Sequence, residues 1–183
     1  MTSLRLFVAI YPPSDLAKQL IDALPALDLP DHRPSPVEQV HLTLHFIGDI
    51  DARQLEDVRE SVRRAAAGLP KFELVPQRLM TLPQHGPVRL VACETDLPPV
   101  LAELHQRLVR RLARNPRDHQ RFAPHMTLCR FKTPTVRPGV DHALDSENFP
   151  PFGIESVRLM RSKLLTSGAQ HEVVMTADLV ETA

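Results

Sequence analysis

The sequence predicts a mixed α-helical and β-strand protein with two pseudo-symmetric lobes that face each other. Three observations support this prediction. Helix and strand patterns alternate along the chain, the order strand, helix, strand occurs twice, and each copy ends in a His-x-Thr-Leu motif, at residues 41–44 and 125–128. The 183 residues are enough for one substantial domain. We therefore expect a single unit over residues 1–183.

The first half of the chain shows a strand, a helix and a motif strand, followed by a second helix. Ser14 is suited to cap the first helix, and Gly68 is suited to end the second. The expected elements are a strand at 4–10, a helix at 14–24, a strand at 40–47, a helix at 51–67 and two short strands within 72–82.

The second half repeats this plan and adds a tail of strands. The expected elements are a strand at 88–93, a helix at 98–115, a strand at 124–131, and closing strands at 154–159, 164–165 and 171–179. A shift by 84 residues, the separation of His41 and His125, aligns the helix starts and places Arg5-Leu6 on Arg89-Leu90 without a gap. Identities are few, but the elements recur in order, so we infer two lobes that each carry one motif.

Each motif has the side-chain pattern of a β-strand, with His and Thr on one face and apolar residues on the other. Residues two apart in a strand are about 7 Å apart, so His41 neighbours Thr43 and His125 neighbours Thr127. A neutral imidazole accepts a proton near pH 7 and an imidazolium donates one. Threonine hydroxyls can donate hydrogen bonds to phosphate oxygens. The two motifs therefore predict general acid and base catalysis at phosphorus, in a cleft between the strands.

Composition excludes several classes of function. Lys plus Arg equals Asp plus Glu at 22 each, which gives no net field for a long nucleic acid, although a short or terminal piece is compatible. Cys93 and Cys129 are too few for a disulfide scaffold or a four-Cys zinc site, which favours a reducing, cytoplasmic setting. The start MTSLRLFVAIYPP lacks a signal-peptide pattern, and no segment approaches the roughly 20 apolar residues that span a bilayer. We expect a soluble, unexported protein without membrane contact.

Four stretches of the sequence match one known family. They are RLFVAIYPP at the start, HLTLHFIGDI and RFAPHMTLCRFK around the two motifs, and Ser162-Lys163-Leu164 followed by Gly168 in the tail. On these stretches the chain resembles the 2H phosphoesterases, specifically the bacterial and archaeal RNA 2',3'-cyclic phosphodiesterases that are also called 2'-5' RNA ligases. The resemblance covers nearly the whole chain. One His-x-Thr occurs often by chance, whereas two at this separation in the family's flanking sequence are a specific match.

This resemblance implies a two-lobed α+β fold in which antiparallel sheets meet at a cleft and helices lie outside. It implies hydrolysis of a 2',3'-cyclic phosphate to a 2'-phosphate without a metal or cofactor. The partner is then RNA with a cyclic end or a small cyclic nucleotide, and we expect a monomer. His41 and His125 become the acid and base, and Thr43 and Thr127 hold the phosphate. We take His125 to activate water and His41 to protonate the 3'-oxygen, although the near symmetry of the motifs leaves the reverse open.

Three further residues are placed by pattern and resemblance. Arg130 stands where the family often carries an arginine, and a guanidinium suits phosphate contact, but strict alternation puts it opposite His125 unless a twist or bulge intervenes. Phe7 lies opposite the core face of its strand, where it either stacks on a nucleobase or forms a second core. His45 is expected on the His41 face, at about 13 Å, which is too far for both to bind one zinc ion.

Two other functions stay open. The first is 2'-5' ligation or 2'-5' phosphodiester cleavage as the main activity. The second is a non-catalytic module that binds nucleotides or RNA ends, which the presence of both histidines and both threonines argues against. The tail shows Gln170-His171 where the family commonly carries an aromatic residue, so base recognition is expected to differ. Ser162 either lines the cleft or makes a hydrogen bond at a strand end.

Overall fold

The computed structural model describes residues 3–114, 122–136, 139–165 and 168–181. Its α-helices are α1 (Ser14–Asp22), α2 (Leu55–Ala66) and α3 (Pro99–Leu112), with 3-10 turns at η1 (Leu24–Ala26), η2 (Val37–Gln39) and η3 (Ala52–Gln54). Its strands are β1 (Ser3–Ile10), β2 (His32–Pro34), β3 (Leu42–Asp51), β4 (Phe72–Leu74), β5 (Pro76–Leu82), β6 (Val88–Thr95), β7 (His125–Thr135), β8 (Asp141–Ala143), β9 (Phe152–Ile154), β10 (Ser156–Leu165) and β11 (Gly168–Asp178).

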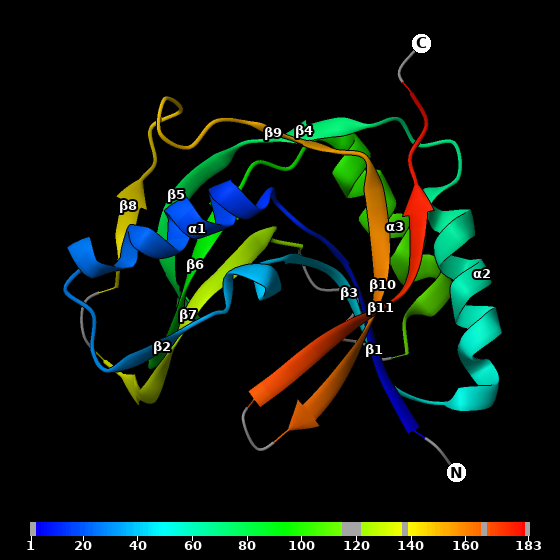
Figure 1. Cartoon of the computed structure of the whole chain (residues 1–183), viewed down its shortest axis with the longest axis horizontal. Coiled ribbons are helices and arrows are strands. Elements are labelled where there is room, and N and C mark those ends of the chain that lie inside the picture. Colours follow the sequence, from blue (N-terminus) through cyan, green and yellow to red (C-terminus); the bar gives the residue numbers. More distant parts are fainter. Residues whose placement is uncertain (1–2, 115–121, 137–138, 166–167, 182–183) are drawn as a thin grey trace.

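Most strands belong to one sheet that is made of two halves. The order is β11-β10-β1-β3-β7-β6-β5-β8, with β2 paired to β7, while β4 and β9 form a separate small sheet. The pairs between these strands are antiparallel. Figure 1 shows β5, β6 and β7 on one side of the molecule and β1, β10 and β11 on the other. The predicted α+β fold with antiparallel sheets is confirmed.

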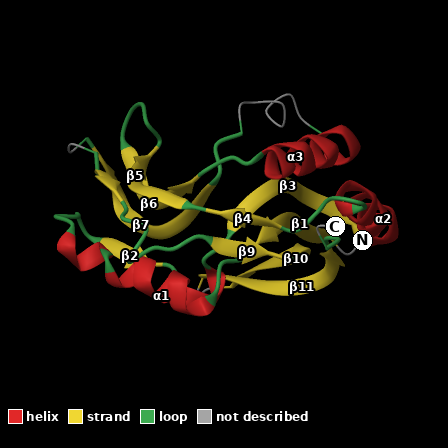
Figure 2. Cartoon of the chain, turned by 90° about the horizontal axis from the view of Figure 1, so that it is seen from above, coloured by secondary structure: helices red, strands yellow, loops and turns green. Residues whose placement is uncertain are grey.

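The helices lie outside the sheet, and two of them cross between the copies. α1 belongs to the first copy but contacts β7 of the second, whereas α3 belongs to the second copy and contacts β3 of the first. Figure 2 shows α1 beside β2 and α3 beside β3. α2 packs on α3 and also contacts β10 and β11. Each half of the sheet is therefore covered by a helix from the other copy.

The two copies correspond at a slightly different spacing from the one expected. β1 pairs with β3 so that Ile10 lies opposite Leu42, and β6 pairs with β7 so that Cys93 lies opposite Met126. Equivalent residues of the first strands, Ile10 and Cys93, are thus 83 residues apart in the sequence. Equivalent residues of the motif strands, Leu42 and Met126, are 84 residues apart. The gap-free alignment of Arg5-Leu6 with Arg89-Leu90 was wrong by one residue, since the pairing matches Val8-Ala9-Ile10 with Val91-Ala92-Cys93.

Side-chain burial separates a large core from a small one. Leu4, Leu6, Val8 and Ile10 of β1 enter the main core, together with Leu16 and Leu20 of α1. The opposite face of β1 and β10 carries a second cluster of Phe7, Ala9 and Met160, with Tyr11 packed against it. The motif histidine of the first copy, His41, lies on this second face beside Phe7.

Three short strands, β2, β8 and β9, were not expected. Each has three residues, which is too short to show a period of two. β2 lies in the proline-rich stretch and extends the edge of β7, where Arg33 pairs with Arg130. Within the described residues, no helix is long and apolar enough to cross a membrane.

Candidate active site

The two motifs meet where the halves of the sheet join. Among the residues that the structure describes, β3 and β7 share one register pair, Leu42 opposite Met126, the middle residues of the two motifs. Both side chains are buried, at 1% and 0% exposure. In an antiparallel pair the flanking residues lie on the opposite face, with the residue before one opposite the residue after the other. A regular continuation of this pair would place His41 beside Thr127, and Thr43 beside His125.

A β-bulge follows the threonine in both motifs. The register of β3 on β1 runs from Thr43 to His45 and omits Leu44, and the register of β7 on β6 runs from Thr127 to Cys129 and omits Leu128. A bulge inserts one residue and shifts the alternation of faces beyond it. The same irregularity therefore occurs at equivalent places in both copies.

The bulges change the faces of the residues that follow them. His45 is 5% exposed, whereas Phe46 after it is 47% exposed. The expectation that His45 shares the His41 face was wrong, because simple alternation does not hold across the bulge. In β7, Cys129 is buried and Arg130 is exposed. The bulge that Arg130 needed to reach the His125 face is therefore present.

Both motif imidazoles are held by the same backbone contact. His41 Nδ1 is 2.6 Å from the carbonyl oxygen of Gln39, and His125 Nδ1 is 2.8 Å from that of Ala123. A carbonyl only accepts, so Nδ1 is the donor in each contact. The neutral form of each ring then has its lone pair on Nε2, which leaves Nε2 for proton transfer. Both imidazoles are half-buried.

Three rings enclose His41. The ring of Phe7 is 5.1 Å from it between centroids, the ring of His171 is 5.2 Å away, and the ring of Tyr11 is 5.5 Å away. This burial lowers the pKa of His41 to about 4; the Gln39 hydrogen bond opposes the shift, and the charges of His171, Arg130 and His125 add to it. His41 is therefore neutral at pH 7 in the free protein.

Each motif threonine has a small neighbour on the adjacent strand. Thr43 lies opposite Ala9, and Thr127 lies opposite Ala92. Both alanines are fully buried, whereas Thr43 is exposed and Thr127 is half-buried. Methyl groups beside the hydroxyls leave room for a bulky group such as a phosphate. Ser35 further braces the second motif, since its hydroxyl donates to the Thr127 carbonyl oxygen at 3.0 Å.

Phe7 lies on the face of β1 opposite the main core, as expected, and this face is also the side of His41. It is only 4% exposed and packs against the imidazoles of His41 and His171. This position suits a support beneath the two rings, in agreement with the second-core alternative. Stacking of Phe7 on a nucleobase stays a prediction.

Sequence reasoning missed Tyr11 and Ser35 as neighbours of the motifs. Tyr11 precedes Pro12-Pro13, which reads as the start of a loop, and Ser35 lies in the proline-rich stretch. Their positions depend on tertiary pairing, which local patterns do not report. The sequence did indicate a place for His171 in the site, because His171 occupies the tail position where the family commonly carries an aromatic residue.

A pocket of about 360 Å³ adjoins His125. It is lined by Met80, Leu82, Pro83, Gln84, His85, Glu94, Ala123, Pro124 and His125. Glu94 lies opposite His125 in the register of β6 and β7, and the Arg78 guanidinium donates to its carboxylate at 2.6 Å. The wall beside His125 thus combines apolar side chains with fixed polar groups, as ligand pockets usually do.

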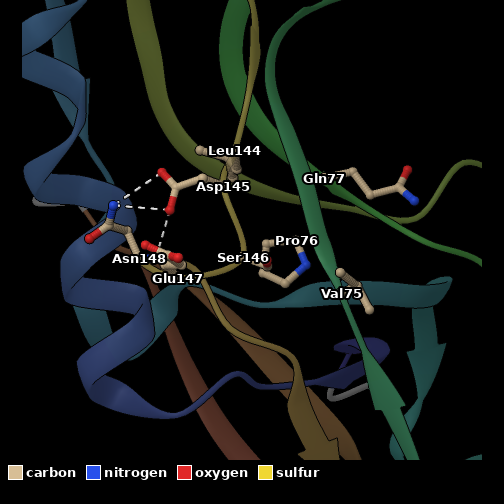
Figure 3. A pocket seen from close by; sticks show the side chains of 8 residues that line it. All are labelled: Val75, Pro76, Gln77, Leu144, Asp145, Ser146, Glu147 and Asn148. Atoms are coloured by element: carbon tan, nitrogen blue, oxygen red, sulfur yellow. Dashed lines mark hydrogen bonds between the residues drawn. The ribbon is translucent and has the colours of Figure 1, made fainter.

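A larger pocket of about 800 Å³ lies between β5 and residues 144–148 (Figure 3). Two of its polar residues are bound to each other, since the Asn148 backbone and side-chain nitrogens both donate to the Asp145 carboxylate. These bonds lower the pKa of Asp145. The larger pocket contains neither motif, so we place the candidate site at the junction of β3 and β7.

The described part of the chain holds no cluster of metal-ligating side chains. No group of three or more His, Cys, Asp or Glu side chains lies together there as metal ligands would. Cys93 and Cys129 are buried thiols, and burial raises the pKa of Cys93 to about 12.

Comparison with known proteins finds a family model, relatives and solved structures that are similar to this chain. The model of the 2'-5' RNA ligase superfamily matches residues 12–164. A curated relative from Thermus thermophilus, named RNA 2',3'-cyclic phosphodiesterase, is 27% identical over 179 residues, which cover 93% of this chain and 88% of the relative. A relative of the same name from Thermotoga maritima is 22% identical over 176 residues and 93% of both chains.

Solved structures share the fold. A crystal structure of a Thermus thermophilus protein has a TM-score of 0.80 and 26% identity, covering 98% of this chain and 100% of that one. The E. coli LigT structure in complex with 3'-AMP has a TM-score of 0.79 and 23% identity over the same shares. The family model spans most of the chain, including both His-x-Thr motifs. The chain therefore belongs to the 2'-5' RNA ligase superfamily.

Proposed function

We propose that the protein is an RNA 2',3'-cyclic phosphodiesterase that opens cyclic ends to 2'-phosphomonoesters by acid and base catalysis at His41 and His125. The names of its curated relatives support this activity. The observation that carries the mechanism is the Leu42–Met126 register pair. In regular strands, it puts the Cα atoms of the two histidines on one face at roughly 7–8 Å. Two imidazole side chains can then reach one phosphate from opposite sides.

We assign the base to His41 and the acid to His125, the reverse of the assignment first taken from the sequence. The low pKa of His41 keeps Nε2 unprotonated at pH 7 in the free protein. The charge of a bound phosphodiester then raises the pKa of His41 in the complex, which helps it to hold the proton it receives. His125 lacks the ring enclosure of His41 among the described residues. As the second imidazole of the pair, His125 takes the role of acid and donates a proton to the leaving oxygen.

The reaction then runs in one displacement. A water oxygen forms a bond to phosphorus while the water proton moves to His41 Nε2. The bond between phosphorus and the 3'-oxygen breaks, and His125 Nε2–H donates its proton to that oxygen. The hydroxyls of Thr43 and Thr127 donate to the nonbridging oxygens, where negative charge accumulates. Arg130 adds a positive charge on the same face. The product keeps the phosphate on the 2'-oxygen.

A second candidate is the 2'-5' ligase or phosphodiesterase reaction. It is favoured by the equivalent Nδ1 contacts of the two histidines, because each Nε2 can either give or take a proton. In ligation, a 5'-hydroxyl attacks phosphorus in place of water. Its proton moves to one histidine while the other histidine protonates the leaving oxygen. Assays with 2'-5' linked and cyclic-ended substrates, compared by kcat/KM, separate the two activities.

The proposed function is tested by the product and its metal requirement. An oligonucleotide with a 2',3'-cyclic end is incubated with the protein in excess chelator, and the phosphate position is identified by chromatography against 2'- and 3'-phosphate standards. We expect a 2'-phosphate at the rate seen without chelator. A 3'-phosphate product would refute the regiochemistry. Loss of activity in chelator would refute metal-independent catalysis, and tight binding of 2'-phosphate without any turnover would favour a binding module.

A further inference from the structure

Arg158 faces the candidate site from β10 without a carboxylate partner among the described residues. It pairs with Ala9 of β1, which in turn pairs with Thr43 of β3, so the three side chains form one row across the sheet. Neighbouring strands are about 4.8 Å apart, which puts the Cα of Arg158 roughly 10 Å from that of Thr43. Ala9 between them is small and buried. No carboxylate lies within ion-pair distance of Arg158 in the described part of the chain, although many of its other arginines have such a partner.

Tyr11 lies between Arg158 and His41. The Arg158 guanidinium is 5.0 Å from the centroid of the Tyr11 ring, and that ring is 5.5 Å from His41. The Tyr11 hydroxyl is buried and has no hydrogen-bond partner within the described residues. Buried hydroxyls nearly always have such a partner. Burial also raises the pKa of Tyr11 to about 12, so the hydroxyl keeps its proton and remains a donor.

The charges of Arg130 and Arg158 act on different groups of the candidate site. The charge of Arg130 acts on the pKa of His41, whereas the charge of Arg158 acts on that of Tyr11. Arg130 belongs to β7 and Arg158 to β10, in opposite halves of the sheet. Arg130 therefore suits the phosphate that reacts, and Arg158 suits a phosphate farther away.

We propose that Arg158 and Tyr11 bind a second phosphate of the substrate, the one on the 5'-oxygen of the ribose that carries the cyclic end. The inference rests on the proposed function and names its substrate class. A guanidinium offers paired donors that match phosphate oxygens, and the Tyr11 hydroxyl adds a third. In an oligonucleotide this phosphate is the last internucleotide diester; in a mononucleotide it is a 5'-phosphate. The site thereby selects RNA ends over nucleoside 2',3'-cyclic phosphates.

The test measures kcat/KM for three substrates: adenosine 2',3'-cyclic phosphate, its 5'-phosphorylated form, and a dinucleotide with the same cyclic end. We expect the wild type to prefer both phosphorylated substrates by about tenfold or more, the change given by one charge-assisted hydrogen bond. Arg158→Gln should remove this preference and keep the rate on the unphosphorylated substrate within about twofold. Tyr11→Phe should reduce the preference less.

Arg161→Gln is the matched control. Arg161 lies on the same strand but pairs with Leu6, a residue of the main core, so it occupies the other face of β10. The Arg161→Gln variant loses the same charge as Arg158→Gln and should keep the preference for phosphorylated substrates. Arg158→Lys keeps the charge and should retain part of the preference, which guards against misfolding as the cause. A preference for the dinucleotide alone would identify the diester as the natural ligand, and an equal preference would identify the phosphate itself.

The outcomes separate the two proposals. If none of the three substrates is opened, the proposed function fails. If all three are opened equally by the wild type, or if Arg158→Gln lowers all three rates by the same factor, the second phosphate site is refuted while the proposed function stands. The result that supports the site is a loss confined to the phosphorylated substrates.

Discussion

Leu42 and Met126 lie opposite each other at the junction of β3 and β7, and each is the middle residue of a His-x-Thr motif. The pair is fully buried, so its apolar side chains anchor both motifs to the main core. The histidine and threonine on either side of each anchor face the other way. Packing of these two buried side chains therefore helps to set the position of one imidazole relative to the other.

This relationship predicts that Leu42→Ala impairs catalysis beyond its effect on stability. Removing a buried leucine side chain costs about 2–5 kcal/mol and lets the junction relax. Leu74→Ala in β4 is the matched control, because Leu74 is equally buried in the same core but belongs to the separate sheet of β4 and β9. Urea unfolding should give similar losses for both variants. We expect kcat/KM to fall at least about tenfold more in Leu42→Ala; equal kcat/KM would show that the junction does not position the histidines.

The enclosure of His41 predicts an unusual pH profile. With His41 as base, kcat/KM should decrease only below about pH 4, because its pKa is lowered from 6.5 to about 4. Burial is the main cause, and the charge of His171 adds to it. His171→Gln removes that charge and part of the cover, so the pKa of His41 should rise and the acid limb should move towards neutral pH. Rates measured from pH 3.5 to 8 test this, and an unmoved acid limb would contradict it.

The lowered pKa of His41 also predicts how the free energy of unfolding depends on pH. The pKa of His41 is about 4 when folded and 6.5 when unfolded, so between these values the unfolded chain binds more protons. The free energy of unfolding should therefore decrease as the pH falls from about 6.5 to about 4, by roughly 3 kcal/mol in total from this group. In His41→Gln this part of the loss should be absent. Chemical unfolding of the wild type and of His41→Gln at pH 7.5 and 4.5 gives this comparison. An equal change in the free energy of unfolding between the two pH values would refute the buried, neutral state of His41.

The bulge in β3 predicts a role for His105 of α3. Its Nδ1 donates to the carbonyl oxygen of Leu44, the bulged residue, at 2.8 Å, while its ring stacks on Phe122 at 4.0 Å. His105→Phe keeps a ring for stacking but loses the hydrogen bond. We expect a loss of about 1 kcal/mol in stability and a several-fold lower kcat, because the bulge sets the direction of Thr43.

The control for this variant is Phe122→Leu, which keeps the His105 hydrogen bond and removes the stack. It should lower the free energy of unfolding without changing kcat. Equal effects of the two variants on kcat would assign His105 a packing role only.

The motifs and the order of elements could be predicted from sequence because they depend on local patterns. Apolar residues alternate around His41 and His125, and a helix follows the first strand of each copy. The faces of His45 and Arg130 could not be predicted, because each lies beyond a bulge and a bulge is a property of strand pairing. The contact of Tyr11 with His41 could not be predicted for a similar reason, since the two rings come together only when β1 and β3 pair. The alternation of faces along a strand therefore predicts which way a side chain points only as far as the first bulge in the strand pairing.

The most direct test of the paired-histidine mechanism is the hydrolysis of a 2',3'-cyclic nucleotide by His41→Ala, His125→Ala and the double variant. An acid and a base that act on one phosphate work as a unit, so their losses should not add. We expect each single variant to lose about 10²-fold or more in kcat/KM, and the double variant to lose little further. Near wild-type hydrolysis by either single variant, or a double-variant loss equal to the product of the two single losses, would contradict the mechanism.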